Sequence, residues 1–319
     1  MVINWLDGVE AFLVIASYFL TSKFLKTEQS EIAVGEVFLH RIKRLYPAYL
    51  TIVLLFAVVL FAHTRRVNPE SLWYILSLQN FRVLFEHATY DLDGFLGHFW
   101  YIGLDVWLFL LWVVIMRMVP RKYLKVAFVI SVISGIAWRT SFILMGKYAA
   151  SYVIPIGQLD CWALGGLLAL NIKEKGKSNV VMLLEITLGI LGIVGLTIYN
   201  AFLSGCSIGE SYQLWHSSGG YVHNILTGNI HFVIALLSVG ILRFCIDTTR
   251  HHPILSSAPL VALGGMTYEL YCFHYPIKVV VKHFIQNDYL MVIAALIATC
   301  IVTLLWSRYA MPVFKKIIK

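Results

Sequence analysis

Residues 180–202 read VVMLLEITLGILGIVGLTIYNAF. A helix needs about 20 predominantly apolar residues to cross the hydrocarbon core of a bilayer, and this segment is long enough. Its apolar residues do not alternate with polar ones, so the pattern does not indicate a strand. Because lipid leaves only helices and closed barrels as spanning structures, the segment predicts a transmembrane helix that carries one ionisable residue, Glu185.

Apolar segments of this kind extend through the chain. Of its 319 residues, 59% are hydrophobic and 13% are charged, whereas soluble domains have about 45–50% and 25%. This composition excludes a soluble globular enzyme, a disordered chain and a coiled coil. We find about nine windows of spanning length: 8–25, 46–62, 99–119, 125–145, 153–172, 180–202, 229–246, 260–282 and 289–310. The sequence therefore predicts an all-α, polytopic transmembrane helix bundle that forms one domain over residues 1–319.

The distribution of basic residues predicts an orientation. Most of the 25 Lys and Arg residues lie in segments that would share one side, such as 23–45, 117–125 and the C-terminal tail. The positive-inside rule makes that side cytoplasmic, so residue 1 is expected outside and the C-terminus inside. The rule also explains the net charge of +8 without nucleic acid. Because no cleavable signal peptide is visible, we expect a further span to precede Met1.

The juxtamembrane segment FLHRIKRLYP, residues 38–47, holds a candidate phosphate site. Arg41 and Arg44 are three residues apart on an expected helix and would project from nearly one face. Two guanidinium groups side by side suit a phosphorylated ligand, because each can bind phosphate bidentately. The alternative is ordinary positive-inside flanking.

Ionisable residues inside the apolar windows form a second group of candidates: Asp105, Arg139, Asp160, Glu185 and Glu269. Such residues usually face the bundle interior and pair with one another. The expected topology places Asp105, Arg139 and Asp160 in the outer half, so Arg139 is expected to pair with one of the two aspartates. A structural ion pair and a catalytic role are both open.

Two histidines near the expected outer surface are candidates for proton transfer. His98 opens one window, and His274 lies close to Pro276, which should free a helical carbonyl. Histidine is suited to accept and return a proton near neutral pH. The alternative is a hydrogen-bonded interfacial residue. The sequence contains no Gly-rich phosphate loop, GxSxG or HExxH motif and no CxxC pair, and it predicts no metal site. To this point the pattern fits a transporter as well as an enzyme.

Four segments, in order, resemble the integral-membrane acyltransferase-3 family of O-antigen and polysaccharide O-acetylases. Residues 7–21 resemble its GVDxFFVLSGFLI span, and residues 38–49 resemble its RxxRLxPAY element. Residues 98–105 resemble HxWSLxxE, with Asp105 in place of Glu. Residues 263–276 resemble LGxxSYxLYLxHxP, with His274 and Pro276 matched, and Asp160 fits a weaker D-x-x-x-x-G element.

The resemblance implies a ten-span enzyme of the bacterial inner membrane. It would move an acyl group, usually acetyl, from cytosolic acyl-CoA to a sugar hydroxyl of an envelope or lipid-linked glycan. Arg41 and Arg44 would bind the acyl-CoA phosphates at the inner side. Asp105 and Asp160 would orient groups in an outer cavity, and His98 and His274 would shape the acceptor site.

The chain departs from the family pattern at its beginning. The family's first span carries an Arg and the His taken as the catalytic base, whereas this chain has no His before His40. A late start codon, a truncated gene and a variant that uses another His are the three explanations. Two other functions stay open: a transporter or flippase for a lipid-linked sugar, and a catalytically inactive homologue.

Overall fold

A computed structural model describes residues 8–65, 71–85, 96–175, 178–211, 225–248 and 253–317, and this part of the chain contains helices and no strand. The all-α expectation is therefore confirmed for the described residues.

The α-helices are α1 (Val9–Phe24), α2 (Val34–Thr64), α3 (Ser71–Ile75), α4 (Arg82–Phe85), α5 (Trp100–Met118), α6 (Leu124–Leu144), α7 (Tyr148–Val153), α8 (Leu159–Lys175), α9 (Asn179–Ser204), α11 (Ile225–Gly228), α12 (Ile230–Thr248), α13 (Ala258–Gly265), α14 (Thr267–Phe284), α15 (Asp288–Leu305) and α16 (Met311–Ile317). Short 3₁₀ turns are η1 (Gln29–Glu31), η2 (Gln79–Phe81), η3 (Gly97–Phe99), η4 (Arg121–Tyr123) and η5 (Pro155–Gln158), and η6 (Trp306–Ala310) is a π turn.

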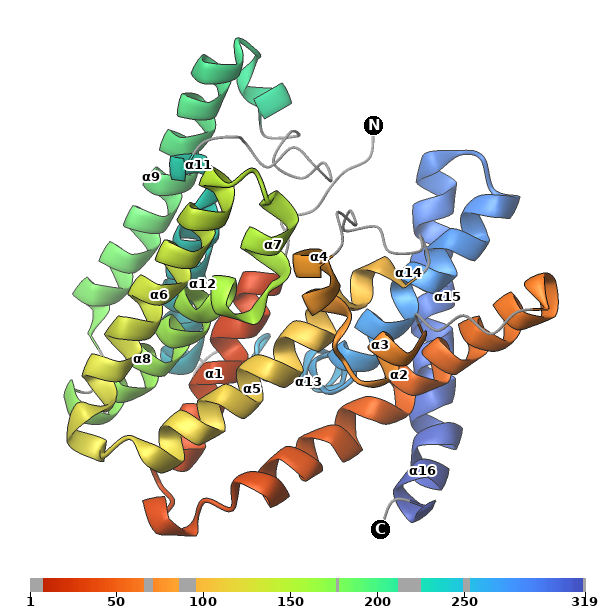
Figure 1. Cartoon of the computed structure of the whole chain (residues 1–319), viewed down its shortest axis with the longest axis horizontal. Helices are drawn as coiled ribbons and strands as arrows, with labels where there is room; N and C mark the ends of the chain where they lie inside the picture. Colours follow the sequence, from red (N-terminus) through yellow and green to blue (C-terminus); the bar gives the residue numbers. More distant parts are fainter. Residues whose placement is uncertain are drawn as a thin grey trace.

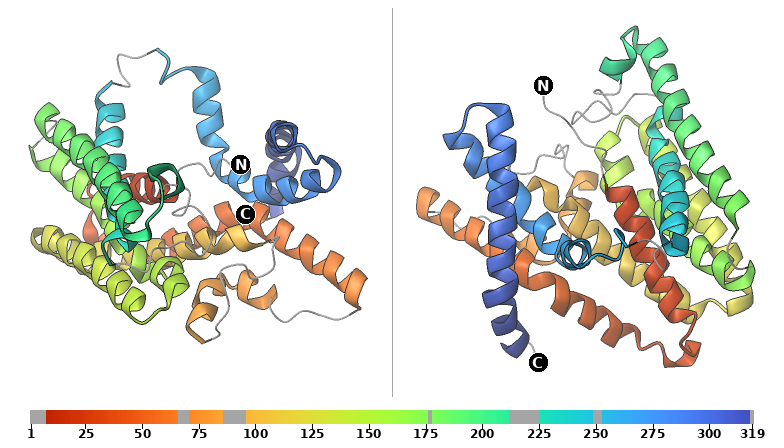
Figure 2. Two further views of the ribbon diagram at one scale, coloured as in Figure 1. Left: turned by 90° about the horizontal axis from the view of Figure 1, so that it is seen from above. Right: turned by 180° about the vertical axis from the view of Figure 1, so that it is seen from behind.

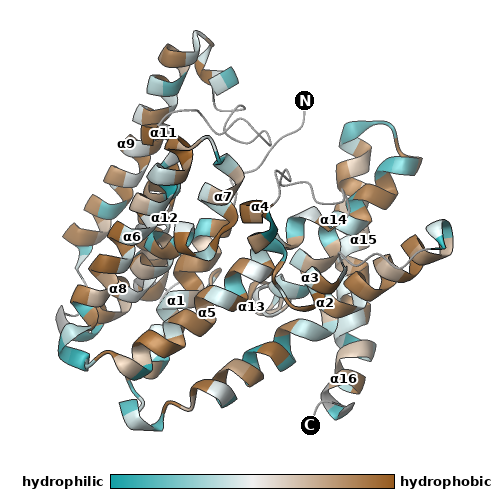
Figure 3. Ribbon diagram, in the orientation of Figure 1, coloured by the Kyte–Doolittle hydropathy of each residue, from teal (hydrophilic) through white to brown (hydrophobic). Residues whose placement is uncertain are grey.

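Helix α9 contains the apolar segment 180–202. Ser178 caps its first turn by accepting a hydrogen bond from the Val181 amide, and Gly205 ends it in the left-handed conformation. Glu185 is neutralised by Arg243 of α12, whose Nη2 and Nε lie 2.7 Å and 2.8 Å from the two carboxylate oxygens. Apolar residues cover most of α9 (Figure 3), and only 11% of its most apolar window is buried, so most of its surface suits lipid.

Helix α5 lies between two groups of helices (Figures 1 and 2). One side of α5 packs with α1, α6, α8 and α12 in a core that includes Trp112 and Trp162. Its other side packs with α2 and α14 in a second core that includes Tyr49 and Phe99. Residues of α5 belong to both cores, so this helix fixes the position of one group relative to the other.

Five apolar helical stretches among the described residues are long enough to cross a membrane: Val34–Thr64, Gly97–Met118, Arg121–Leu144, Asn179–Ser204 and Asp288–Phe314. They make the chain a multi-pass membrane protein. Nine spans and the expected orientation stay predictions.

Two of the expected windows are not single helices. Window 153–172 is interrupted at η5, where Pro155 begins the turn, and window 260–282 is interrupted at Met266, between α13 and α14. Continuous apolar composition did not reveal these breaks, because Pro155 and the Gly264-Gly265 pair interrupt helices without adding charge.

Gly165 permits a close contact between α1 and α8. A Cβ atom at this position would lie 2.0 Å from Ser17 Oγ and 2.2 Å from the Val14 carbonyl oxygen. Because the second of these atoms is backbone, the helices would have to move apart.

We expect Gly165→Ala to destabilise the protein by about 1–3 kcal/mol, the usual cost of overpacking. Thermal unfolding of the detergent-solubilised protein measures this as a lower Tm. Gly195→Ala is the matched control, because Gly195 lies in α9 with nothing within 4 Å of a new Cβ. An unchanged Tm for Gly165→Ala would contradict the close packing of α1 on α8.

Candidate functional site

The first polar site forms where α14 meets the start of α5. Pro276 has no N–H, so the carbonyl of Cys272, four residues earlier in α14, loses its helical partner. His98 places its Nε2 3.3 Å from this carbonyl oxygen. Because a carbonyl only accepts, Nε2 carries the hydrogen and Nδ1 is the basic nitrogen. This Nδ1 is buried and has no hydrogen-bond partner among the described residues.

His274 lies beside His98, with 5.4 Å between the ring centroids. Its Nδ1 is 2.6 Å from the Tyr271 carbonyl oxygen, so Nδ1 donates and Nε2 is basic. The Tyr271 hydroxyl in turn donates to the His98 carbonyl, and Tyr275 stacks on His98 at 5.1 Å. The structure therefore brings the two predicted histidines together, each held by a backbone carbonyl and each with one nitrogen able to take up a proton.

The predicted arginine site differs from expectation. Arg41 Nη2 lies 2.7 Å and 2.9 Å from the two carboxylate oxygens of Asp105, and the guanidinium covers the Phe109 ring at 5.0 Å. Arg41 and Asp105 were expected near opposite membrane surfaces, and this separation is wrong. Helix α2 packs on α5, and this contact brings the first turns of α2 against Asp105. Arg44 is exposed.

His98 lies in η3, directly before α5, and Asp105 lies in the second turn of α5. Tyr101 lies between them, and its ring is 5.2 Å from Tyr271. The arginine–aspartate pair and the histidine pair thus lie at two ends of one strip of polar and aromatic side chains between α2, α5 and α14.

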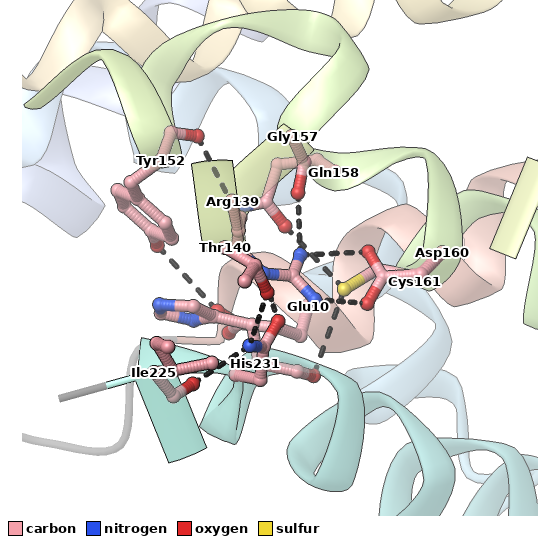
Figure 4. Close-up of polar contacts among 11 residues, drawn as sticks. Glu10, Arg139, Thr140, Tyr152, Gly157, Gln158, Asp160, Cys161, Ile225 and His231 are labelled. Carbon is pink, nitrogen blue, oxygen red and sulfur yellow. Dashed lines mark hydrogen bonds and ion pairs between the residues drawn. The ribbon is translucent and has the colours of Figure 1, made fainter. Parts of the chain in front are cut away.

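A second polar cluster is buried among α1, α6, α8 and α12 (Figure 4). Arg139 Nη1 lies 2.8 Å from Asp160 Oδ1, and Nη2 contacts the other carboxylate oxygen. Arg139 also donates to the Gly157 carbonyl in η5 and to Asn229 Oδ1 at 3.2 Å. Of the two aspartates that were expected as possible partners of Arg139, Asp160 forms the pair and Asp105 does not. Both side chains are fully buried, and this favours the structural ion pair over a substrate contact.

Glu10 and His231 belong to the same cluster, and the sequence did not indicate that they meet. His231 Nδ1 lies 2.6 Å from Glu10 Oε1, and the Tyr152 hydroxyl lies 3.5 Å from the same oxygen. Glu10 is fully buried. Because Arg139 is already paired with Asp160, the His231 ring and the Tyr152 hydroxyl are the groups that contact this buried carboxyl. The only signal in the sequence was the presence of both residues in apolar windows.

Comparison with known proteins identifies the family. The sequence model of a protein family, described as an acyltransferase domain, matches residues 8–310 of this chain. The chain belongs to the acyltransferase-3 family. The O-acetyltransferase OatA of Staphylococcus aureus (strain NCTC 8325 / PS 47) is 24% identical over 344 residues, which cover 98% of this chain and 54% of the relative. The peptidoglycan O-acetyltransferase OatA of Listeria monocytogenes serovar 1/2a is 24% identical over 312 residues, which cover 85% of this chain and 44% of the relative.

This acyltransferase-3 chain spans about half the length of the curated relatives it matches. No solved structure matches it. Three of its four motif segments converge in the structure: Arg41 from α2, His98 and Asp105 at the start of α5, and His274 from α14. Asp160 does not join them, because it lies in the cluster around Arg139 on the other side of α5.

Proposed function

We propose that this chain is a membrane O-acyltransferase that moves an acetyl group from cytosolic acetyl-CoA to a sugar hydroxyl of a cell-envelope glycan. Membership of the acyltransferase-3 family supports the reaction type. The names of the OatA relatives support O-acetylation, and the Listeria relative points to peptidoglycan as the acceptor. The bacterial inner membrane is the compartment in which acetyl-CoA and an envelope glycan would meet the two ends of such a protein.

The proposed reaction needs a base and an oxyanion site. The basic nitrogen of His98 or His274 takes the proton of the sugar hydroxyl, and the oxygen attacks the thioester carbonyl carbon. A tetrahedral oxyanion forms, the C–S bond breaks, and the CoA thiolate leaves. The imidazolium returns its proton to the thiolate, so the histidine is regenerated and no net proton is used.

One observation carries the proposal: Tyr101, one turn before Asp105 in α5, and Tyr271 of α14 connect the Arg41–Asp105 pair with the His98–His274 pair, since the Tyr271 ring lies 5.2 Å from the Tyr101 ring and 5.5 Å from the His98 ring. Arg41 and the exposed Arg44 would bind the acyl-CoA phosphates, and Asp105 would hold the Arg41 guanidinium in position. The tyrosines between the two ends would line the path of the acyl group.

Removing both arginines tests the donor site. We expect the Arg41→Ala/Arg44→Ala double variant to bind acetyl-CoA at least about tenfold more weakly, because each charge-assisted contact contributes about 1.5–3 kcal/mol. Isothermal titration with the purified protein measures the Kd, and transfer of radiolabelled acetyl from acetyl-CoA to peptidoglycan fragments measures the reaction. Lys122→Ala/Lys125→Ala removes the same charge near η4 and should bind normally. An unchanged Kd of acetyl-CoA in the Arg41→Ala/Arg44→Ala variant would contradict the assignment of the donor site.

A transporter or flippase for a lipid-linked sugar is the second candidate. Transporter sites typically use interrupted helices, and the breaks at η5 and at Met266 are two such interruptions. This candidate requires movement of a labelled lipid-linked sugar across proteoliposomes without any acyl-CoA. Acetyl transfer that depends on His98 would instead support the enzyme.

A further inference from the structure

Tyr101 lies in the middle of the candidate site. It comes four residues before Asp105 in α5, so the two side chains are neighbours on one face of the helix. Its ring lies 5.2 Å from the ring of Tyr271 in α14 and 6.2 Å from the ring of Phe12 in α1. Arg41, which is bound to Asp105, is also within electrostatic range of Tyr101. Tyr101 is therefore close to the arginine–aspartate pair on one side and to the aromatic contacts of the histidine pair on the other.

The hydroxyl of Tyr101 has no hydrogen-bond partner in the part of the chain that the structure describes. Four other tyrosines around it each use their hydroxyl in a hydrogen bond to the protein: Tyr46, Tyr49, Tyr268 and Tyr271. Of these five tyrosines, Tyr101 is the one whose hydroxyl is left for a ligand within the described residues.

The side chains on both sides of Tyr101 keep part of their surface accessible. Tyr101, Tyr271, His98 and His274 are half-buried, and the side chain of Arg41 is 22% exposed. None of these side chains is enclosed in an apolar core. An extended ligand can therefore contact them in turn.

The surroundings of the Tyr101 hydroxyl suit a neutral polar group. The charge of Arg41 is balanced by Asp105, whose Oδ2 lies 2.7 Å from Nη2. The rings of Phe12 and Tyr271 flank Tyr101 and suit methylene groups. A hydroxyl can donate to a carbonyl and accept from an N–H, so an amide satisfies it in either direction. The pantetheine arm of CoA combines these features, because it consists of amides joined by methylene groups.

We propose that the Tyr101 hydroxyl binds an amide group of the pantetheine arm and thereby favours a donor that is linked to CoA. The inference rests on the proposed function for its choice of CoA. With the phosphates at Arg41 and Arg44 and the thioester at the histidines, the arm that joins them passes Tyr101. Tyr101 is thus a specificity residue for the donor, and it takes no part in proton transfer.

Removal of the hydroxyl tests the inference by binding alone. Acetyl-CoA is titrated into the purified full chain in detergent, and so is 3′-phosphoadenosine 5′-diphosphate, which is CoA without its pantetheine arm. We expect Tyr101→Phe to weaken the binding of acetyl-CoA by about fivefold or more, because one hydrogen bond is lost. The Kd of the nucleotide should stay unchanged. Tyr289→Phe is the matched control, because Tyr289 is exposed at the start of α15, and it should bind both ligands like the wild type.

The outcomes separate this inference from the proposed function. An equal loss for both ligands would show a structural role for Tyr101, and this result, or an unchanged Kd of acetyl-CoA, would overturn the inference. Failure of the wild type to bind acetyl-CoA would overturn the donor of the proposed function and this inference with it. A loss confined to acetyl-CoA, in a protein that transfers no acetyl, would keep the arm site and overturn the acyltransferase reaction.

Thermal unfolding checks that each variant is folded. Tyr101→Met also lacks a hydroxyl, and its flexible side chain adapts to the space of the ring. It replaces Tyr101→Phe in the same titrations if that variant does not fold.

Discussion

Asp160→Asn should unfold at much lower temperature than the wild type, with a loss of about 3–5 kcal/mol in the free energy of unfolding. The change keeps the size of the side chain and removes its charge. Arg139 would then carry an uncompensated charge in a place where both residues are fully buried. Its remaining partners, the Gly157 carbonyl and Asn229, are neutral and cannot replace the carboxylate. Unfolding of the detergent-solubilised protein by heat or by denaturant measures the loss.

The same substitution at the surface provides the control. Asp288 is exposed in the first turn of α15, so Asp288→Asn should cost less than about 1 kcal/mol. A second comparison replaces Arg139 and Asp160 together by apolar residues, which should cost less than the single change because no charge is stranded. If Asp160→Asn were as stable as Asp288→Asn, this result would contradict a large contribution of the Arg139–Asp160 ion pair to the free energy of unfolding.

The largest effect on activity is expected at the histidine pair. His98→Gln should lower the rate of acetyl transfer by about 10²–10⁴-fold, which is the usual contribution of a general base. Glutamine can still donate to the Cys272 carbonyl but cannot take up a proton at neutral pH. The Kd of acetyl-CoA should stay unchanged, because the arginine end of the site is untouched. His274→Gln tests the second imidazole in the same assay.

His283→Gln is the matched control for these variants. His283 lies near the end of α14 and is exposed, so its replacement should leave the transfer rate within about twofold, as most surface changes do. Full activity in both His98→Gln and His274→Gln would remove the pair from the reaction and leave the base to be sought elsewhere, first at His231.

Much of the fold follows from the amino-acid composition and from the length of the apolar segments. Segment 180–202 predicted α9 almost to its ends, because its caps lie directly outside the apolar run. The two broken windows were not predicted, since hydropathy sums residues and does not see where Pro155 or Met266 interrupts the backbone. Charge counting predicted sides of the membrane, yet it could not predict that α2 crosses α5 with Arg41 against Asp105.

Pairing inside the membrane was predictable only in part. The sequence predicted a carboxylate partner for Arg139 but did not distinguish Asp105 from Asp160. The packing of α6 on α8 places Asp160 against Arg139. The contact of Glu10 with His231 joins residues 221 positions apart, and no local spacing encodes it. The freed carbonyl of Cys272 was predictable from Pro276, but its use as the partner of His98 depends on how α14 meets α5.

Helix α5 enters both apolar cores, and this has a mechanical consequence. A slide or roll of this helix would stretch the contact of Asp105 with Arg41 and the contact of His98 with Cys272 in the same movement. The two ends of the candidate site therefore share one rigid support, and a movement of that support reaches both ends together.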